Sequence, residues 1–139
     1  MIVCSIGHGY LASFLFKELC ALGVIGLGIS SKATFLHKNL DNFKIFNRSE
    51  VKYAIPFSTH LLVTAPSNKK GCPVLNNYFN LIAKSNIKSI TYISTTGVYG
   101  NHKGDVVDED SLLKPKYSSD RHRILAEGQW VNFSKNNNN

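Results

Sequence analysis

The sequence predicts an α/β fold, a doubly wound parallel sheet with helices on both faces and the strand order 3-2-1-4-5. Two observations predict this class. Short apolar runs alternate along the chain with segments of helical periodicity, and a glycine ends the run at residues 2–6 and a proline the run at residues 60–65. Runs bounded in this way are typical of strands buried on both faces, as parallel sheets require. We expect one domain over residues 1–134, followed by a disordered polar tail over residues 135–139.

The strands follow from these apolar runs. They are expected at residues 2–6, 24–29, 43–46, 60–65 and 89–94. A polar, helix-like piece is expected around residues 32–39, and a long polar loop over residues 95–117 separates the last strand from the last helix.

Three further helices are expected, each with one apolar face turned to the sheet. The first begins at Tyr10 and stops at Gly23, the second begins at Pro73, and the third begins near Ser118. The expected buried stripes are Tyr10, Leu11, Phe14, Leu15, Leu19 and Leu22 in the first helix, Val74, Leu75, Tyr78, Phe79 and Ile82 in the second, and Ile124, Leu125 and Trp130 in the third.

Composition excludes several classes of protein. No run approaches the roughly 20 apolar residues that a membrane span needs, so we expect a cytoplasmic protein with no membrane partner. The three cysteines are widely spaced among apolar residues, which favours reduced core thiols over disulfides or a metal site. The net charge of +7 comes mostly from scattered lysines, so a solvated surface is favoured over a nucleic-acid-binding one.

The first strand is followed by Gly7-His8-Gly9-Tyr10-Leu11-Ala12, which matches the G-x-G-x-x-G/A pattern of dinucleotide-binding turns. In that pattern the first glycine permits the tight turn, the second lets the backbone approach a pyrophosphate, and the small residue lets the helix pack on the strand. A purely structural turn is the alternative. We expect the pyrophosphate along Gly7, Gly9, Tyr10 and Leu11, and we interpret His8 as a partly exposed loop residue.

The segment after the second strand bears on the choice between NAD and NADP. An acidic residue about 20 positions after the glycines normally binds the ribose of NAD, whereas this chain has Ser30-Ser31-Lys32. Two hydroxyls and an ammonium suit a 2′-phosphate, so NADP is favoured and NAD stays open. Alternatively, Ser30 and Ser31 only cap the next helix.

The fifth expected strand leads into YISTTGVYG at residues 92–100, and Val107-Asp108-Glu109, Lys114-Pro115 and Ala126-Glu127 follow. This pattern resembles the extended short-chain dehydrogenase/reductase family, also called the NAD-dependent epimerase/dehydratases. The resemblance extends over residues 1 to about 131. It implies that Thr95 hydrogen-bonds a substrate hydroxyl or carbonyl. The remaining cofactor contacts expected on this basis are Ala65, Pro66 and Ser67 in the middle of the cofactor and Ser94 near the nicotinamide.

The family's Tyr-x-x-x-Lys dyad is not matched. Counting back from Glu127 puts Arg123 at the lysine position and Ser119 at the tyrosine position. Arg123 is expected to hold ribose or phosphate. Tyr117 is a candidate acid/base, but a two-residue shift on a helix rotates a side chain by about 200°. Packing at the helix entrance is therefore its alternative role.

The resemblance also implies a further, distal portion that completes the sheet and builds the substrate pocket, so we expect the chain to be truncated before it. A split or degraded enzyme is one interpretation, with a homodimer or a complementary chain as partner. Two functions stay open: an oxidoreductase or epimerase acting on a small molecule, and a non-catalytic module that binds a nucleotide or a protein.

Overall fold

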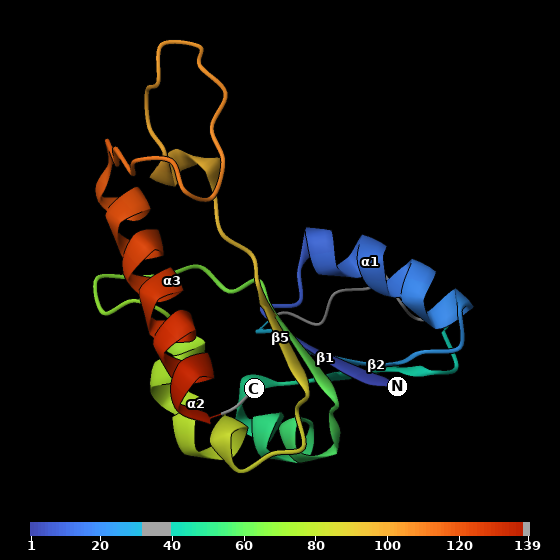
Figure 1. Ribbon diagram of the computed structural model, residues 1–139. Helices are drawn as coiled ribbons and strands as arrows, with labels where there is room; N and C mark the ends of the chain where they lie inside the picture. Colours follow the sequence, from blue (N-terminus) through green and yellow to red (C-terminus); the bar gives the residue numbers. More distant parts are fainter. Residues whose placement is uncertain (32–39, 138–139) are drawn as a thin grey trace.

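The computed structural model describes residues 1–31 and 40–137 and contains a five-stranded sheet (Figure 1). All four strand pairings are parallel, and the order is β3-β2-β1-β4-β5, which confirms the predicted fold class. The strands are β1 Ile2–Ile6, β2 Ile25–Ile29, β3 Phe43–Phe46, β4 His60–Val63 and β5 Ser89–Tyr92. Because β1 lies between β2 and β4, the chain order reverses at the β1–β4 pair.

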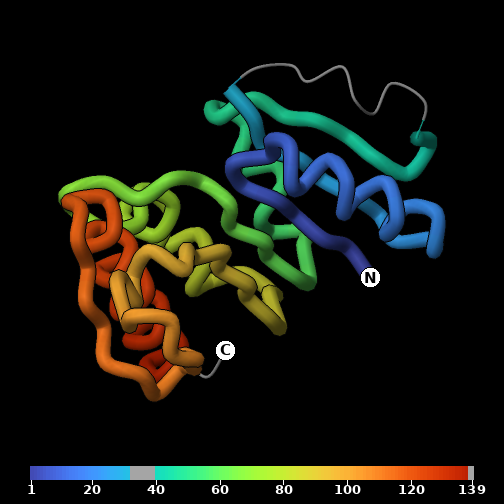
Figure 2. The backbone as a smooth tube through the Cα atoms, turned by 90° about the horizontal axis from the view of Figure 1, so that it is seen from above, coloured from blue at the N-terminus to red at the C-terminus, as the bar shows by residue number. Residues whose placement is uncertain are grey.

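Helices cover both faces of the sheet. Helix α1 (Tyr10–Ala21) lies on one face, whereas α2 (Pro73–Ala83) and α3 (Ser118–Asn137) lie on the other (Figures 1 and 2). Three 3-10 helices complete the described elements: η2 Arg48–Tyr53, η3 Ile55–Phe57 and η4 Thr96–Val98. None of the helices in the described residues is long and apolar enough to cross a membrane.

The predicted orientation of α1 is wrong. Most of its apolar stripe faces outward, with Tyr10 79% and Phe14 57% exposed, whereas Leu19 packs against the core and the small Ala12 and the large Phe16 are fully buried. The reason lies in β2, where a Cβ on Gly26 would stand 2.6 Å from the Phe16 ring. The helix therefore approaches the sheet where glycine leaves room for one ring, and this fit outweighs the larger number of apolar side chains on its other side.

The other two helices follow their predicted faces in part. Val74, Leu75 and Ile82 of α2 are buried, but Phe79 is 46% exposed. In α3 Trp130 is buried and Leu125 is 45% exposed.

The predicted disordered tail and the predicted helix-like piece after β2 are described only in part or not at all. Helix α3 extends to Asn137, so residues 135–137 of the predicted tail are helical. Residues 138–139 and the predicted helix-like piece at 32–39 lie outside the described residues.

The three cysteines are all buried and free, as predicted.

Candidate functional site

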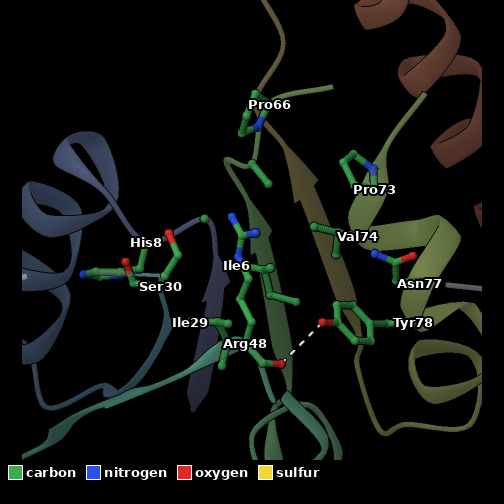
Figure 3. A pocket seen from close by; sticks show the side chains of 13 residues that line it. Ile6, His8, Ile29, Ser30, Arg48, Pro66, Pro73, Val74, Asn77 and Tyr78 are labelled. Atoms are coloured by element: carbon green, nitrogen blue, oxygen red, sulfur yellow. Dashed lines mark hydrogen bonds between the residues drawn. The ribbon is translucent and has the colours of Figure 1, made fainter. Parts of the chain in front are cut away.

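A cleft of about 320 Å³ opens at the carboxyl edge of the sheet, at the reversal between β1 and β4 (Figure 3). Its walls come from the ends of β1 and β2, the segment after β4, the start of η2 and the first two turns of α2. In open parallel sheets, connections diverge to opposite faces at such a reversal and leave a crevice for a ligand. None of the described residues lining this cleft is acidic.

The turn after β1 fits the role predicted for its first glycine. Gly7 has φ +92°, and a Cβ there would stand 2.5 Å from the amide nitrogen of Ala65, so only glycine fits. The Gly7 and His8 amides both donate to the Ile29 carbonyl, at 3.1 and 2.9 Å, and Thr64 Oγ1 donates to the Gly7 carbonyl at 2.7 Å. The turn is thereby fixed to the ends of β2 and β4.

The N-terminus of α1 is uncapped and points its amides out of the turn. Gly9 is the N-cap residue and makes no side-chain cap, and the first turn contains no acidic residue. The first helical hydrogen bond runs from the Ser13 amide to the Gly9 carbonyl, so the four amides from Gly9 to Ala12 precede the helical ladder and make no backbone hydrogen bond with the described residues. These donors, together with the positive end of the helix dipole, favour an anion such as phosphate.

Gly9 differs from Gly7 in an informative way. Its φ of −134° is extended, and a Cβ there would meet only the Gly7 carbonyl oxygen, at an ordinary contact distance of 3.5 Å. The fold itself therefore tolerates a side chain at Gly9. A glycine that packing does not require is consistent with close approach by a ligand.

His8 is not the partly exposed loop residue that we predicted. It is only 2% exposed, its Nδ1 lies 2.5 Å from Ser5 Oγ, and Figure 3 shows the ring turned away from the cleft. Its ring centroid is 5.2 Å from that of Phe16 and 5.0 Å from that of Phe43. The sequence signal was Gly28 on β2, where a Cβ would stand 2.9 Å from the His8 ring.

Most of the predicted cofactor contacts on the adenosine side border the cleft. Ser30 and Ser31 line it beyond the end of β2, and Ala65 and Pro66 line it beyond β4. Lys32 lies outside the described residues, and Ser67 is not among the lining residues.

Arg48 also lines the cleft, and sequence reasoning missed it. It is the first residue of η2 and follows β3 by two residues. Because the strands are parallel, the end of β3 lies at the same edge as the ends of β1 and β2, so the predicted strand order already pointed to this residue.

A second hollow, of about 660 Å³, lies beyond β5 and brings the two predicted catalytic residues together. Thr95 and Tyr117 both line it, with Lys114, Lys116 and Asp120. The Thr95 hydroxyl accepts a hydrogen bond from the Gly97 amide at 3.2 Å.

Tyr117 is held through its backbone and is exposed at its ring. Its amide donates to Asp120 Oδ2 at 3.0 Å, the side chain is 61% exposed, and Lys116 Nζ lies 5.3 Å from the ring centroid. A hydroxyl, a phenol and a neighbouring ammonium group together can hold a polar substrate and exchange a proton with it.

The remaining predicted contacts join α3 to β5. Arg123 Nη1 donates to the Tyr92 hydroxyl at 2.9 Å and to the Ile93 carbonyl at 3.0 Å, and Ser94 Oγ donates to Glu127 Oε1. Burial raises the pKa of the Tyr92 phenol, and the hydrogen bond and charge of Arg123 oppose that rise only in part. Neither Arg123 nor Ser94 is among the described lining residues of the two hollows.

No protein-family model and no curated protein matches the sequence. Solved structures do match the fold. A functionally unknown conserved protein from Silicibacter pomeroyi is 31% identical, with a TM-score of 0.82 over 93% of this chain and 47% of its own. UDP-glucuronic acid 4-epimerase from Bacillus cereus in complex with NAD is 18% identical, with a TM-score of 0.83 over 99% of this chain and 54% of its own.

A short-chain dehydrogenase/reductase superfamily protein from Agrobacterium tumefaciens with bound NAD is 13% identical, with a TM-score of 0.72 over 97% of this chain and 45% of its own. This chain therefore spans about half the length of these proteins. The likeness, together with the strand order, shows a Rossmann-like α/β fold.

Proposed function

We propose that this chain binds a nicotinamide dinucleotide and is the cofactor-binding part of an oxidoreductase or epimerase related to the NAD-dependent epimerases/dehydratases. One observation carries the proposal: the turn at Gly7 presents an uncapped helix N-terminus at the edge of the cleft between β1 and β4. Two proteins of similar fold, from Bacillus cereus and Agrobacterium tumefaciens, are complexes with NAD, which supports the same class of cofactor here.

The cofactor would extend along the carboxyl edge from the cleft toward β5. The pyrophosphate would accept hydrogen bonds from the free amides that begin α1, and the adenosine ribose would lie against Ser30 and Ser31. The contacts proposed in full are Gly7, Gly9, Tyr10 and Leu11 for the pyrophosphate, Ser30, Ser31 and Lys32 for the ribose, Ala65, Pro66 and Ser67 for the middle, and Ser94 and Arg123 toward the nicotinamide.

We propose NADP rather than NAD as the preferred form. A ribose-binding carboxylate would repel a 2′-phosphate, and none of the described residues lining the cleft is acidic. Two serine hydroxyls at the end of β2 can donate to phosphate oxygens instead. The complexes reported above contain NAD, so this preference would separate the chain from them.

For the chemistry, the nicotinamide ring, when bound, supplies or accepts a hydride. Thr95 would hold a substrate hydroxyl or carbonyl oxygen, and Tyr117 would exchange the accompanying proton, since both side chains border the same hollow. The substrate is proposed only as a small molecule with such an oxygen.

Calorimetric titration of the protein with NADPH and with NADH tests the binding proposal. We expect saturable binding of both with one site per chain, and tighter binding of NADPH. ADP-ribose should compete with both, because it contains the diphosphate and the adenosine ribose. Absence of heat and of any rise in melting temperature with all three ligands would refute the proposal.

A further inference from the structure

Arg48 is the cationic side chain that the described residues contribute to the cleft. It follows β3, which pairs with β2, and it lines the same cleft as Ser30 and Ser31, which follow β2. Figure 3 shows its side chain extending toward Pro66, with the guanidinium between Ser30 on one side and Val74 on the other. A residue remote in sequence thus shares a wall with the segment expected to hold the ribose.

The backbone of Arg48 is fixed from two sides. The Tyr78 hydroxyl donates to the Arg48 carbonyl at 3.4 Å, from a point where α2 departs from helical geometry (φ −124°, ψ 17°). On the other side, Asn47 and Glu50 form a capping box, in which the Asn47 amide donates to Glu50 Oε2 at 2.8 Å. These contacts hold the start of η2 against the cleft without using the guanidinium.

The guanidinium itself makes no hydrogen bond and no ion pair with the residues that the structure describes. The carboxylate nearest in sequence, that of Glu50, is already committed to the Asn47 amide. Since the described lining contains no acidic side chain, an anion in the cleft would find an unneutralised fork of N–H donors.

We propose that Arg48 is the specificity-determining residue that binds the 2′-phosphate of NADP, with Ser30 and Ser31 on the other side of that phosphate. This inference rests on the proposed dinucleotide function and adds to it the group that selects between the two cofactors. A guanidinium pairs with a phosphate through two parallel hydrogen bonds, whereas it finds only hydroxyls on the unphosphorylated ribose of NAD.

The test uses two probes that differ only in this phosphate, 2′,5′-ADP and 5′-AMP. Their dissociation constants are measured for the wild type, Arg48→Gln, Arg48→Lys and Lys52→Gln. Lys52 is the matched control because it is an exposed cation of the same short helix, lying 5.0 Å over the Tyr53 ring and not among the lining residues of the cleft. Thermal unfolding of each variant verifies that it is folded.

We expect Arg48→Gln to raise the dissociation constant of 2′,5′-ADP about tenfold. A hydrogen bond to a charged group contributes about 1.5 kcal/mol at the low end of its usual range, and the low end applies because the Arg48 side chain is exposed. Binding of 5′-AMP should be unchanged, Arg48→Lys should lie between, and Lys52→Gln should match the wild type. In the wild type, raising the salt concentration should reduce the preference for 2′,5′-ADP, which gives a test that needs no variant.

Three results would overturn the inference. Equal losses for both probes would mean that Arg48 contacts the base or only supports the fold. Unchanged binding of 2′,5′-ADP by Arg48→Gln would mean that another group binds the phosphate. A wild-type preference that salt does not alter would mean that no exposed cation selects the phosphate. If neither probe binds the wild type, the proposed function fails as well, and this fourth outcome is distinct from the other three.

Discussion

Substitution of Gly7 in the turn after β1 should reduce stability, whereas substitution of Gly9 should reduce NADPH affinity and leave stability nearly unchanged. In Gly7→Ala the new methyl group would stand 2.5 Å from the Ala65 nitrogen, at a φ of +92°. The left-handed conformation costs about 1–2 kcal/mol and overpacking against backbone a further ~1–3 kcal/mol. We therefore expect Gly7→Ala to lower the free energy of unfolding by roughly 2–5 kcal/mol.

Gly9→Val should leave stability nearly unchanged. The Cβ meets only one atom, at 3.5 Å, and the backbone is extended, where a β-branched residue is at ease. Valine is a poorer N-cap than glycine, which destabilises the folded state, but it also makes the unfolded chain less flexible, which has the opposite effect. The free energy of unfolding should therefore change by no more than about 1 kcal/mol. The side chain would, however, occupy the approach to the free amides, and NADPH affinity should fall by at least about tenfold.

Chemical denaturation and calorimetric titration of the same preparations provide the assay. Gly23→Ala is the control for strain, because Gly23 has φ +80° but no atom within 4 Å of a Cβ, so it should lose only the smaller, conformational part. A folded Gly9→Val that binds NADPH like the wild type would refute the reasoning, and so would a Gly7→Ala that is no less stable than Gly23→Ala.

Three further outcomes are expected. Burial raises the pKa of the Cys4 thiol from 9.0 to about 12, so Cys4 should resist thiol reagents in the native state at pH 8, and its contribution to stability should be lost as the pH rises from 9 toward 12, because the unfolded thiol ionises first; fast labelling would contradict this. Asp120→Ala removes the acceptor for the Tyr117 amide at the start of α3 and should lower the free energy of unfolding, measured with denaturant, by about 1 kcal/mol. An unchanged free energy of unfolding would mean that this hydrogen bond does not stabilise the helix. If the proposed chemistry holds, Thr95→Val and Tyr117→Phe should reduce NADPH-dependent carbonyl reduction by the protein without altering the dissociation constant of NADPH. A variant that weakens NADPH binding equally would argue against a chemical role.

The features that the sequence predicts correctly are those in which a backbone conformation requires a particular residue type or in which few chain topologies are allowed. The glycine turn could be predicted because Gly7 must adopt a positive φ beside Ala65, and the strand order could be predicted because right-handed crossovers allow few alternatives. The position of Ser30 and Ser31 at the cleft follows from the same rule, since the carboxyl ends of parallel strands share one edge.

The remaining features depend on fit between side chains that no periodicity encodes. The buried face of α1 is set by Phe16 entering the space above Gly26, so the larger apolar stripe points outward. His8 is buried for the same reason, because Gly28 leaves room for its ring. The part played by Arg48 depends on how Tyr78 holds η2, a contact between residues 30 positions apart.

The central claim is that the amides from Gly9 to Ala12 bind the pyrophosphate of a nicotinamide dinucleotide. Amide proton and nitrogen chemical shifts, followed by NMR while NADPH is added, test it directly. We expect the largest changes at these four amides, with smaller ones at Ser30 and Ser31, and none at Gly23, which follows the opposite end of α1 and is not among the lining residues of the cleft. Shift changes confined to other residues, or none at saturating NADPH, would contradict the claim.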